Sequence, residues 1–291
     1  MIKQLKKIFP SLLIYSDEND NLDKNYKWFI TKDNQVIGIP KDDLNQNELS
    51  LLNTFLSPYN IKFPILTNKE KKWKQIINNS AHEEMKGFYR FVFFSIQQHQ
   101  IDPISFKEAI QELFPNQIPI LWENDHEGII VEEREKNEEP IVYKQIIDLL
   151  MSDLYVKIKF FVGPFRNNLD HVKQHHLSII KDAQTAFNYS KKEVITYSEA
   201  IPFLLIDQVT DSFKKDMSKL ILQDYVNDQE TLQMIKTFVE CNLNISETAK
   251  ELYMHRNSLQ YRLDKFQEKT GLDIRKFHDA MTVYLALIAN D

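Results

Sequence analysis

Residues 238–266 read as two short helices joined by a tight turn, and this pattern constrains the chain more than any other. Apolar residues recur on one face of each helix, at Ile245, Ala249 and Leu252 in the first and at Leu259, Leu263 and Phe266 in the second. Ala249 is small enough for two helices to cross closely. The pattern predicts a helix-turn-helix, whose first helix packs across the second so that the second can enter a major groove of DNA.

Polar side chains face outward from the second helix when its apolar positions are turned inward at about 100° per residue. The candidate DNA-binding residues are His255, Arg256, Asn257, Ser258, Gln260, Tyr261, Arg262 and Lys265. Arg256, Asn257 and Tyr261 are expected at base edges, since Arg and Asn can each form two bonds with a guanine or an adenine. Hydroxyls and flanking cations suit phosphate oxygens, and those expected at phosphates are Ser258, Arg262 and Lys265.

Three alternatives stay open for this stretch. The two helices can be an amphipathic hairpin inside a core, because helical pairs with polar outer faces are common. His255 and Tyr261 can be packing residues. Arg262 can pair on the surface with Asp264 or Glu268, where an ion pair contributes little to stability.

Many further positions in the C-terminal stretch follow one ordered pattern. They are Asn244, Ser246, Thr248, Ala249, Leu252, His255, Arg256, Asn257, Leu259, Tyr261, Arg262, Leu263, Thr270, Gly271 and Leu272. With this set, residues 231–288 resemble the C-terminal DNA-binding domain of the PucR/CdaR family of bacterial transcriptional regulators, whose helix-turn-helix is similar to that of Fis-type proteins. The resemblance implies a sequence-specific regulator that reads the major groove of double-stranded operator DNA.

One residue departs from the general motif. Tyr253 lies in the turn, where many such motifs have Gly. Because a positive φ strains a Tyr, we expect this turn to be made differently.

The charge balance bears on how the DNA would be bound. The whole chain has a net charge of -6. Residues 231–291 contain equal numbers of cations (Lys236, Lys250, Arg256, Arg262, Lys265, Lys269, Arg275 and Lys276) and anions (Glu240, Glu247, Glu251, Asp264, Glu268, Asp273, Asp279 and Asp291). Since most affinity for DNA comes from neutralised phosphates, one copy should bind weakly, and we expect a homodimer or a higher homo-oligomer.

Composition indicates a soluble, cytoplasmic protein, with 43% hydrophobic and 27% charged residues and no segment of roughly 18 consecutive apolar residues. A single cysteine, Cys241, excludes an internal disulfide framework, and we expect it to be a small buried residue. The N-terminal lysines precede only a short apolar patch with Pro10, so we interpret residues 1–15 as the first element of a folded domain.

The predicted fold class is α+β with several domains. Residues 1–66 are expected to form a small α+β unit, with a hairpin of 28–31 and 36–39 and a helix capped by Asn45 with Glu48 in a capping box. The apolar residues of this unit are interpreted as core, and a pocket for a small-molecule effector stays open as the alternative. Residues 67–87 are interpreted as a connector helix, either at a dimer interface or solvated, with a seam of Trp73, Ile76 and Ile77.

Strand and helix patterns alternate over residues 88–226, and 229–291 are expected to be all helical. The strands are expected at 88–96, 118–122, 128–132 and 156–162, and the helices at 102–113, 141–151, 169–187, 200–225 and 277–289. The layout of 88–226 resembles the degenerate GGDEF-like domain of CdaR-type regulators. Where an active cyclase would carry its signature, this chain has Asp125, His126, Glu127 and Gly128, so cyclase residues are absent.

No metal, cofactor or enzyme activity is expected. Asp125, His126 and Glu127 fit a solvated turn, and His171 with His175 has zinc-helix spacing but no visible third ligand, so this helix face is interpreted as polar. Five glycines nearly exclude phosphate cradles. Two competing functions remain, a protein-interaction scaffold that keeps a helix-turn-helix fold without binding DNA and an enzyme acting on nucleotides through the middle domain.

Overall fold

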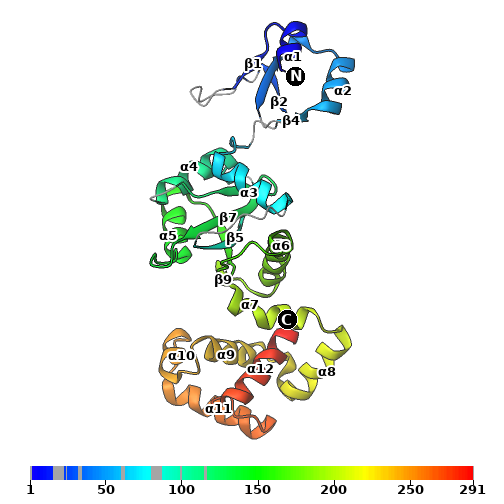
Figure 1. Ribbon diagram of the computed structural model, residues 1–291. Coiled ribbons are helices and arrows are strands. Elements are labelled where there is room, and N and C mark those ends of the chain that lie inside the picture. The colour runs from blue at the N-terminus through cyan, green and yellow to red at the C-terminus, as the bar shows by residue number, and fades with distance from the viewer. Residues whose placement is uncertain are drawn as a thin grey trace.

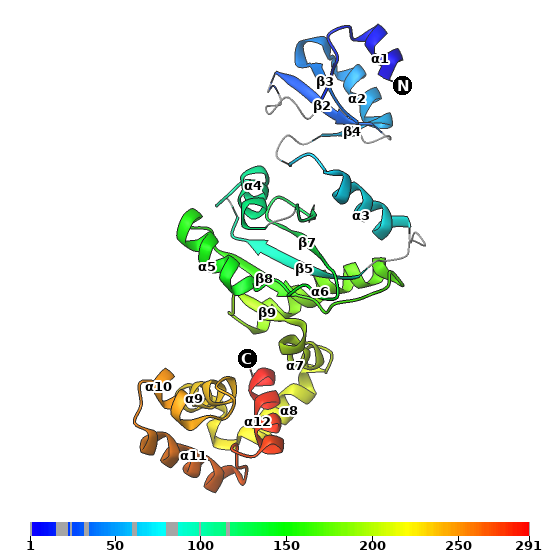
Figure 2. The ribbon, with the colours of Figure 1, turned by 60° about the vertical axis from the view of Figure 1, so that its left-hand side comes forward.

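The computed structural model describes residues 2–15, 23, 25–31, 35–59, 63–79, 87–98, 100–114 and 117–290. In Figure 1 these residues form a row of three parts, from a small N-terminal sheet through a larger sheet with helices to an all-helical C-terminal part. Figure 2 shows the same row from another side, with the C-terminus beside α7. This mixed architecture confirms the α+β fold class.

The N-terminal part is a four-stranded antiparallel sheet with two helices. Its strands are β1 (Leu13–Ile14), β2 (Tyr26–Ile30), β3 (Val36–Pro40) and β4 (Ser57–Pro58), in the order β1-β3-β2-β4, and its helices are α1 (Ile2–Ile8) and α2 (Gln46–Phe55). The predicted hairpin is confirmed as β2 and β3, although part of its turn lies outside the described residues. Asn45 and Glu48 form the predicted capping box at the start of α2.

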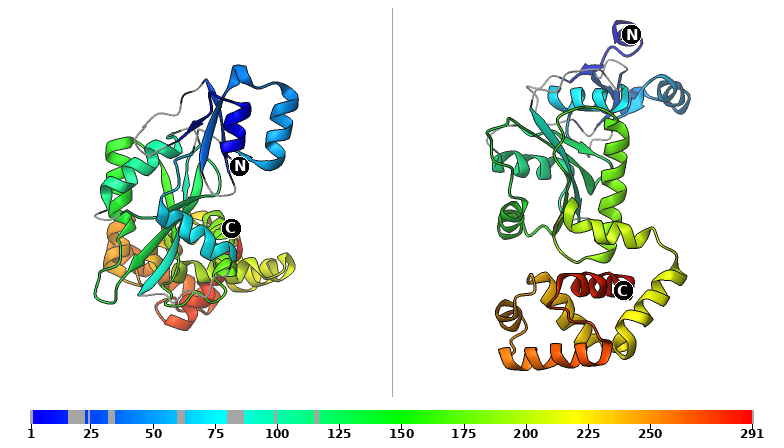
Figure 3. Two further views of the ribbon diagram at one scale, coloured as in Figure 1. Left: turned by 45° about the horizontal axis from the view of Figure 1, so that its top comes forward. Right: turned by 60° about the horizontal axis from the view of Figure 1, so that its bottom comes forward.

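The middle part is a five-stranded sheet with helices on both faces (Figure 3). Its strands are β5 (Phe88–Ile96), β6 (Ile120–Trp122), β7 (Glu127–Arg134), β8 (Ile158–Val162) and β9 (Val194–Thr196), in the order β6-β7-β5-β8-β9. Among the described strands of this sheet, β8 and β9 pair in parallel and the other neighbours pair antiparallel. The sequence predicted four of these strands and missed β9, which is three residues long.

A hydrophobic core lies on each face of this sheet. Strand β5 contributes residues to both cores because its side chains alternate between the two faces. Phe91 and Phe93 pack beneath α3 (Asn68–Asn79) and α6 (Val172–Tyr189). Val92 and Phe94 pack on the other face with α4 (Pro103–Leu113) and α5 (Tyr143–Leu154).

Helix α3, the described part of the predicted connector, is not a solvated linker. Its seam residues Trp73, Ile76 and Ile77 are 2%, 4% and 7% exposed and lie in the core of the middle sheet. Glu70 of α3 is fully buried, where its carboxylate accepts hydrogen bonds from Lys107 Nζ at 2.8 Å and from the Ile120 N–H at 3.0 Å. The large apolar seam and this buried ion pair make α3 a layer of the middle part. The boundaries predicted at 66, 87 and 226 stay predictions.

Two helices, not one, occupy the stretch predicted as helical over 200–225. They are α7 (Tyr197–Asp207) and α8 (Asp211–Leu222), followed by a 3-10 turn, Gln223–Asn227. The hydroxyl of Thr210 accepts from the Phe213 N–H and starts α8 as a separate helix. Phe213, in the first turn of α8, is 56% exposed.

The last helix joins the middle and C-terminal cores. In α12 (Phe277–Asn290), Ile288 belongs to the core of the middle sheet, whereas Val283 and Ala286 belong to the C-terminal core. The Ser218 hydroxyl of α8 donates to the Ala286 carbonyl at 3.2 Å. Helix α12 is thus bound to α8 as well as to the predicted helix-turn-helix. No helix among the described ranges is long and apolar enough to span a membrane.

The histidine face of α6 is buried, which corrects the interpretation of a polar face. His171 has φ 53° and precedes the helix, while His175 and His176 are 7% and 8% exposed and lie against the ring of Phe91. Packing against aromatic rings explains their burial. Within the part of the chain that the structure describes, no three His, Cys, Asp or Glu side chains are grouped as metal ligands.

Candidate nucleic-acid interface

Three helices build the predicted helix-turn-helix region, namely α9 (Gln229–Glu240), α10 (Ile245–Glu251) and α11 (Arg256–Thr270). The apolar stripe of α11 is confirmed, because Leu259, Leu263 and Phe266 are no more than 1% exposed. Ala249 of α10 is 5% exposed and shares their core, as the close helix crossing requires. The opposite face of α11 is therefore held toward solvent by packing.

Several polar residues of the motif start helices. The side-chain oxygen of Asn244 accepts from the Ser246 N–H at 2.9 Å and from the Glu247 N–H at 3.2 Å, which caps α10. His255 caps α11, because its Nδ1 accepts from the Asn257 N–H at 3.2 Å. His255 was predicted to bind DNA, and its ring is already engaged in this cap.

The turn between α10 and α11 contradicts the expectation for Tyr253. Tyr253 has φ 52°, the left-handed conformation that the sequence argument excluded. The Met254 N–H donates to the Ala249 carbonyl at 2.8 Å and the Tyr253 N–H donates to the Lys250 carbonyl at 3.2 Å, the two bonds of a Schellman motif. These bonds offset the strain, and the Tyr253 side chain is 99% exposed.

The predicted base-reading residues lie together at the start of α11. Arg256, Asn257 and Tyr261 are exposed, Tyr261 by 66%. Among the described residues, no hydrogen bond or ion pair engages the side chains of these three. Ser258 and Lys265 are also exposed, and Gln260 is partly buried beside the core stripe. The free side chains of this face are available to a ligand.

Arg262 has a partner that the sequence did not suggest. Its Nη1 forms an ion pair with Oε1 of Glu230 in the first turn of α9. Asp264, one of the partners considered for Arg262, binds Arg275 instead. Glu230, the partner of Arg262, and Arg275, the partner of Asp264, both lie outside α11. Helical spacing along α11 therefore could not identify them.

A groove runs between the start of α9 and the outer face of α11, with a volume of about 640 Å³. We call it the α9–α11 groove. It is lined by Tyr225, Asp228, Glu230, Thr231, Asn257, Ser258, Tyr261, Arg262, Lys265 and Lys269. The structure thus brings five of the eight predicted DNA-binding residues to one groove, and His255, Arg256 and Gln260 lie outside its lining.

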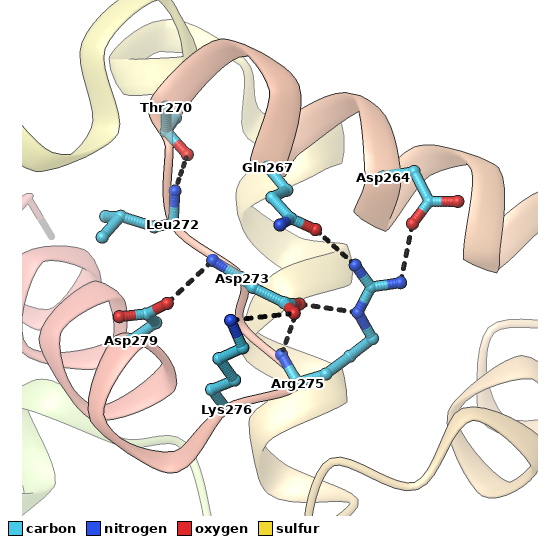
Figure 4. A network of polar contacts seen from close by, with 8 residues as sticks. All are labelled: Asp264, Gln267, Thr270, Leu272, Asp273, Arg275, Lys276 and Asp279. Carbon is cyan, nitrogen blue, oxygen red and sulfur yellow. Dashed lines mark hydrogen bonds and ion pairs between the residues drawn. The ribbon is translucent and has the colours of Figure 1, made fainter.

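Arg275 fixes the loop between α11 and α12, as Figure 4 shows. Its guanidinium donates to Asp264 at 2.6 Å and to Gln267 at 2.5 Å on α11, and to Asp273 at 2.6 Å in the loop. Asp273 in turn accepts from the backbone N–H of Arg275, and its own N–H donates to Asp279 at the start of α12. Sequence reasoning missed this network because its members are up to 15 residues apart, counted from Asp264 to Asp279.

The contacts in this loop shift the pKa values of Asp273 and Arg275. Burial alone would raise the pKa of Asp273, but hydrogen bonds from Arg275 and the nearby charges of Arg275 and Lys276 hold that pKa below its ordinary value. The bonds to Asp273 and Asp264 raise the pKa of Arg275. The ion pairs of Arg275 with Asp273 and Asp264 therefore orient α11 relative to α12.

Comparison with known proteins agrees with this geometry. The PucR C-terminal helix-turn-helix domain matches residues 231–289. Over its whole length the chain is 28% identical to the uncharacterised protein YxkF of Bacillus subtilis (strain 168), of which it covers 99%. It is 27% identical to the purine catabolism regulatory protein of the same organism, over 57% of this chain and 30% of that protein.

A shorter match has higher identity. The chain is 46% identical to the carbohydrate diacid regulator of Escherichia coli (strain K12), over 16% of this chain and 12% of that protein. The similarity to these regulators confirms the resemblance of the C-terminal part, and the GGDEF-like character of residues 88–226 stays a prediction.

Proposed function

We propose, on the premise that residues 231–289 are a PucR-type C-terminal helix-turn-helix domain, that this chain is a sequence-specific transcriptional regulator that reads operator DNA with α11. One observation carries the proposal. The buried stripe of α11 fixes the helix, and Arg256, Asn257 and Tyr261 stand free on its outer face. Such a helix can enter a major groove and present bidentate side chains to base edges.

Each exposed residue has a role in this proposal. Arg256, Asn257 and Tyr261 contact base edges, while Ser258 and Lys265 bind phosphates on the flanks. His255 acts by capping α11. The names of two relatives, purine catabolism regulatory protein and carbohydrate diacid regulator, support a regulatory role. We include control by a small-molecule effector in the proposal and assign the effector no site.

A second copy of this chain completes the proposed DNA-binding unit. Cations and anions are equal in number in residues 231–291, so one domain has little excess charge with which to neutralise phosphates. Two linked domains add their contacts and raise the effective concentration of the second site. Leu205 of α7 and Phe213 and Leu220 of α8 are exposed apolar side chains that a second copy could cover. Analytical ultracentrifugation that finds only monomers, with and without operator DNA, would exclude this part of the proposal.

The test is selection of DNA fragments by the purified full chain, followed by sequencing. The wild type should enrich one motif, and Arg256→Ala with Asn257→Ala should enrich none. Lys181→Ala with Asn188→Ala is a matched control, because it removes the same kinds of exposed side chains from α6. Enrichment by the control but not by the α11 variant supports the reader assignment.

The competing function is a protein-interaction scaffold, which the balanced charge of the domain favours. The two functions differ in their response to salt, since binding to DNA weakens steeply as salt rises and a scaffold shows no such binding. A wild type that enriches no motif between low and physiological salt would favour the scaffold.

A further inference from the structure

The α9–α11 groove holds two carboxylates among cations. Lys265, Lys269 and Arg262 line it from α11, and Asp228 and Glu230 line it at the start of α9. Lys269 is held beside the groove by the ring of Tyr225, 5.4 Å from its Nζ. The groove therefore has the cations that bind phosphate, with one of them already occupied by an internal anion.

The two acidic residues at the start of α9 have different roles. Asp228 caps the helix, since its carboxylate accepts from the N–H and from the hydroxyl of Thr231, and these bonds lower its pKa. The Glu230 carboxylate caps nothing among the described residues, and its bond to Arg262 is the one hydrogen bond or ion pair that this carboxylate makes there. Glu230 can leave Arg262 without disturbing the start of α9.

The pair is also accessible. The side chain of Glu230 is 74% exposed and that of Arg262 is 40% exposed. An ion pair in such contact with water is weak, because solvent screens both charges. A guanidinium binds a carboxylate and a phosphate with the same planar arrangement of N–H groups, so a phosphate is a direct competitor for Arg262.

From these observations, and resting on the function proposed above, we propose that a phosphate of the DNA backbone occupies the α9–α11 groove and displaces Glu230 from Arg262. Glu230 is then a built-in competitor of DNA. Because every duplex carries phosphates, Glu230 lowers the affinity for all sequences equally and leaves the choice of sequence to the base-reading face.

The experiment measures the binding of the full chain to two labelled duplexes, the selected motif and a scrambled version, at several salt concentrations. Glu230→Gln keeps the shape of the side chain and removes its charge. We expect affinity for both duplexes to rise about 2- to 5-fold at low salt. Glu193→Gln, the same change at an exposed residue of the middle part, should have no effect.

The Arg262→Gln background tests the mechanism by a double-mutant cycle. If Glu230 acts by occupying Arg262, then Glu230→Gln should give little or no gain once Arg262 is absent. An equal gain in both backgrounds would show a general charge effect and overturn the proposal. Circular dichroism and thermal unfolding of each variant establish that the fold is kept.

The outcomes separate this proposal from the function on which it rests. A wild type that binds neither duplex overturns both. A wild type that binds DNA, with Glu230→Gln unchanged in affinity, overturns only the competition by Glu230.

Discussion

The guanidinium of Arg275 binds the carboxylate of Asp264 with 2.6 Å between Nη1 and Oδ1. Arg275 lies just before α12, and Asp264 lies on the outer side of α11 (Figure 4). Helix α12 is packed on α8 and, through Ile288, on the core of the middle sheet. The contact therefore ties the orientation of α11 to an element that reaches both cores.

Arg275→Gln should loosen α11 and weaken binding to every duplex. The variant loses charge-assisted bonds to Asp264, Asp273 and Gln267, and we expect the free energy of unfolding to fall by about 1 kcal/mol because the side chain is one-third exposed. Urea unfolding and DNA titration measure the two effects. Lys276→Gln is the control, since Lys276 is 71% exposed and its Nζ lies 4.0 Å from Asp273. Equal losses in both variants would contradict the role of Arg275.

Tyr253→Gly should stabilise the protein. A Tyr at φ 52° carries left-handed strain that Gly lacks, whereas Gly loses more backbone entropy on folding. The strain is the larger effect, so the free energy of unfolding should rise by roughly 0.5 kcal/mol.

The same substitution at Tyr261 is the matched control. Tyr261 is also exposed but lies inside α11, where Gly is a poor helix former, so Tyr261→Gly should lower the free energy of unfolding by about 0.5 kcal/mol. Urea unfolding of both variants gives the comparison. A loss of stability in both would indicate that Tyr253 is not strained.

Local patterns predicted the elements well because their causes lie within a few residues. Leu259, Leu263 and Phe266 recur at helical spacing and are buried as expected. Asn45 and Asp102 cap α2 and α4, where the sequence places a side-chain acceptor before a helical pattern. The sequence could therefore define the outer face of α11 before any contact was known.

Contacts between distant residues were not predictable in this way. Glu230 and Arg262 are 32 positions apart, so no helical spacing along α11 could pair them. The buried carboxylate of Glu70 is bound by Lys107 and by the Ile120 N–H, which are 37 and 50 positions away. Without knowledge of these contacts, the sequence of α3 resembles a polar connector. The Tyr253 turn was predicted wrongly for a different reason, since the prediction considered the general cost of positive φ and not the two backbone hydrogen bonds of this turn.

The buried ring of His175 should make the free energy of unfolding fall in mild acid. Burial first, and then the charges of Arg166 and His176, lower its pKa to about 4, so the folded protein holds a neutral ring at pH 7. Both ring nitrogens are buried without a hydrogen-bond partner in the described structure. In the unfolded chain the ring has a pKa of about 6.5 and takes up a proton first.

The sign follows from proton uptake. Between pH 6.5 and pH 4 the unfolded state binds more protons than the folded state, so stability is complete above about pH 6.5 and falls on the way to pH 4. The loss is on the order of 3 kcal/mol at pH 4. His175→Leu should remove this part of the pH dependence, while His278→Leu, at an exposed position of α12, should leave it unchanged. Unfolding in urea at a series of pH values tests both.

Lys265 and Arg256 should differ in what they contribute to DNA binding. Lys265→Ala removes a cation from the groove flank, so affinity should fall alike for motif and scrambled duplexes, and the slope of log affinity against log salt should become shallower by about 1. Arg256→Ala removes a bidentate donor from the exposed face, so it should cost about 1–3 kcal/mol on the motif and relax the choice at one base pair.

Fluorescence anisotropy at four or more salt concentrations separates the two effects, because only the phosphate contact changes the slope for both duplexes. Arg256→Ala could instead weaken binding to both duplexes equally, and Lys265→Ala could alter the selected motif. Arg256 would then be assigned to a phosphate and Lys265 to a base edge. The free Arg256 side chain at the start of α11 would then lie along the backbone, and Lys265, in the lining of the α9–α11 groove, would face the bases. That outcome would also remove the geometric basis for a phosphate opposite Glu230.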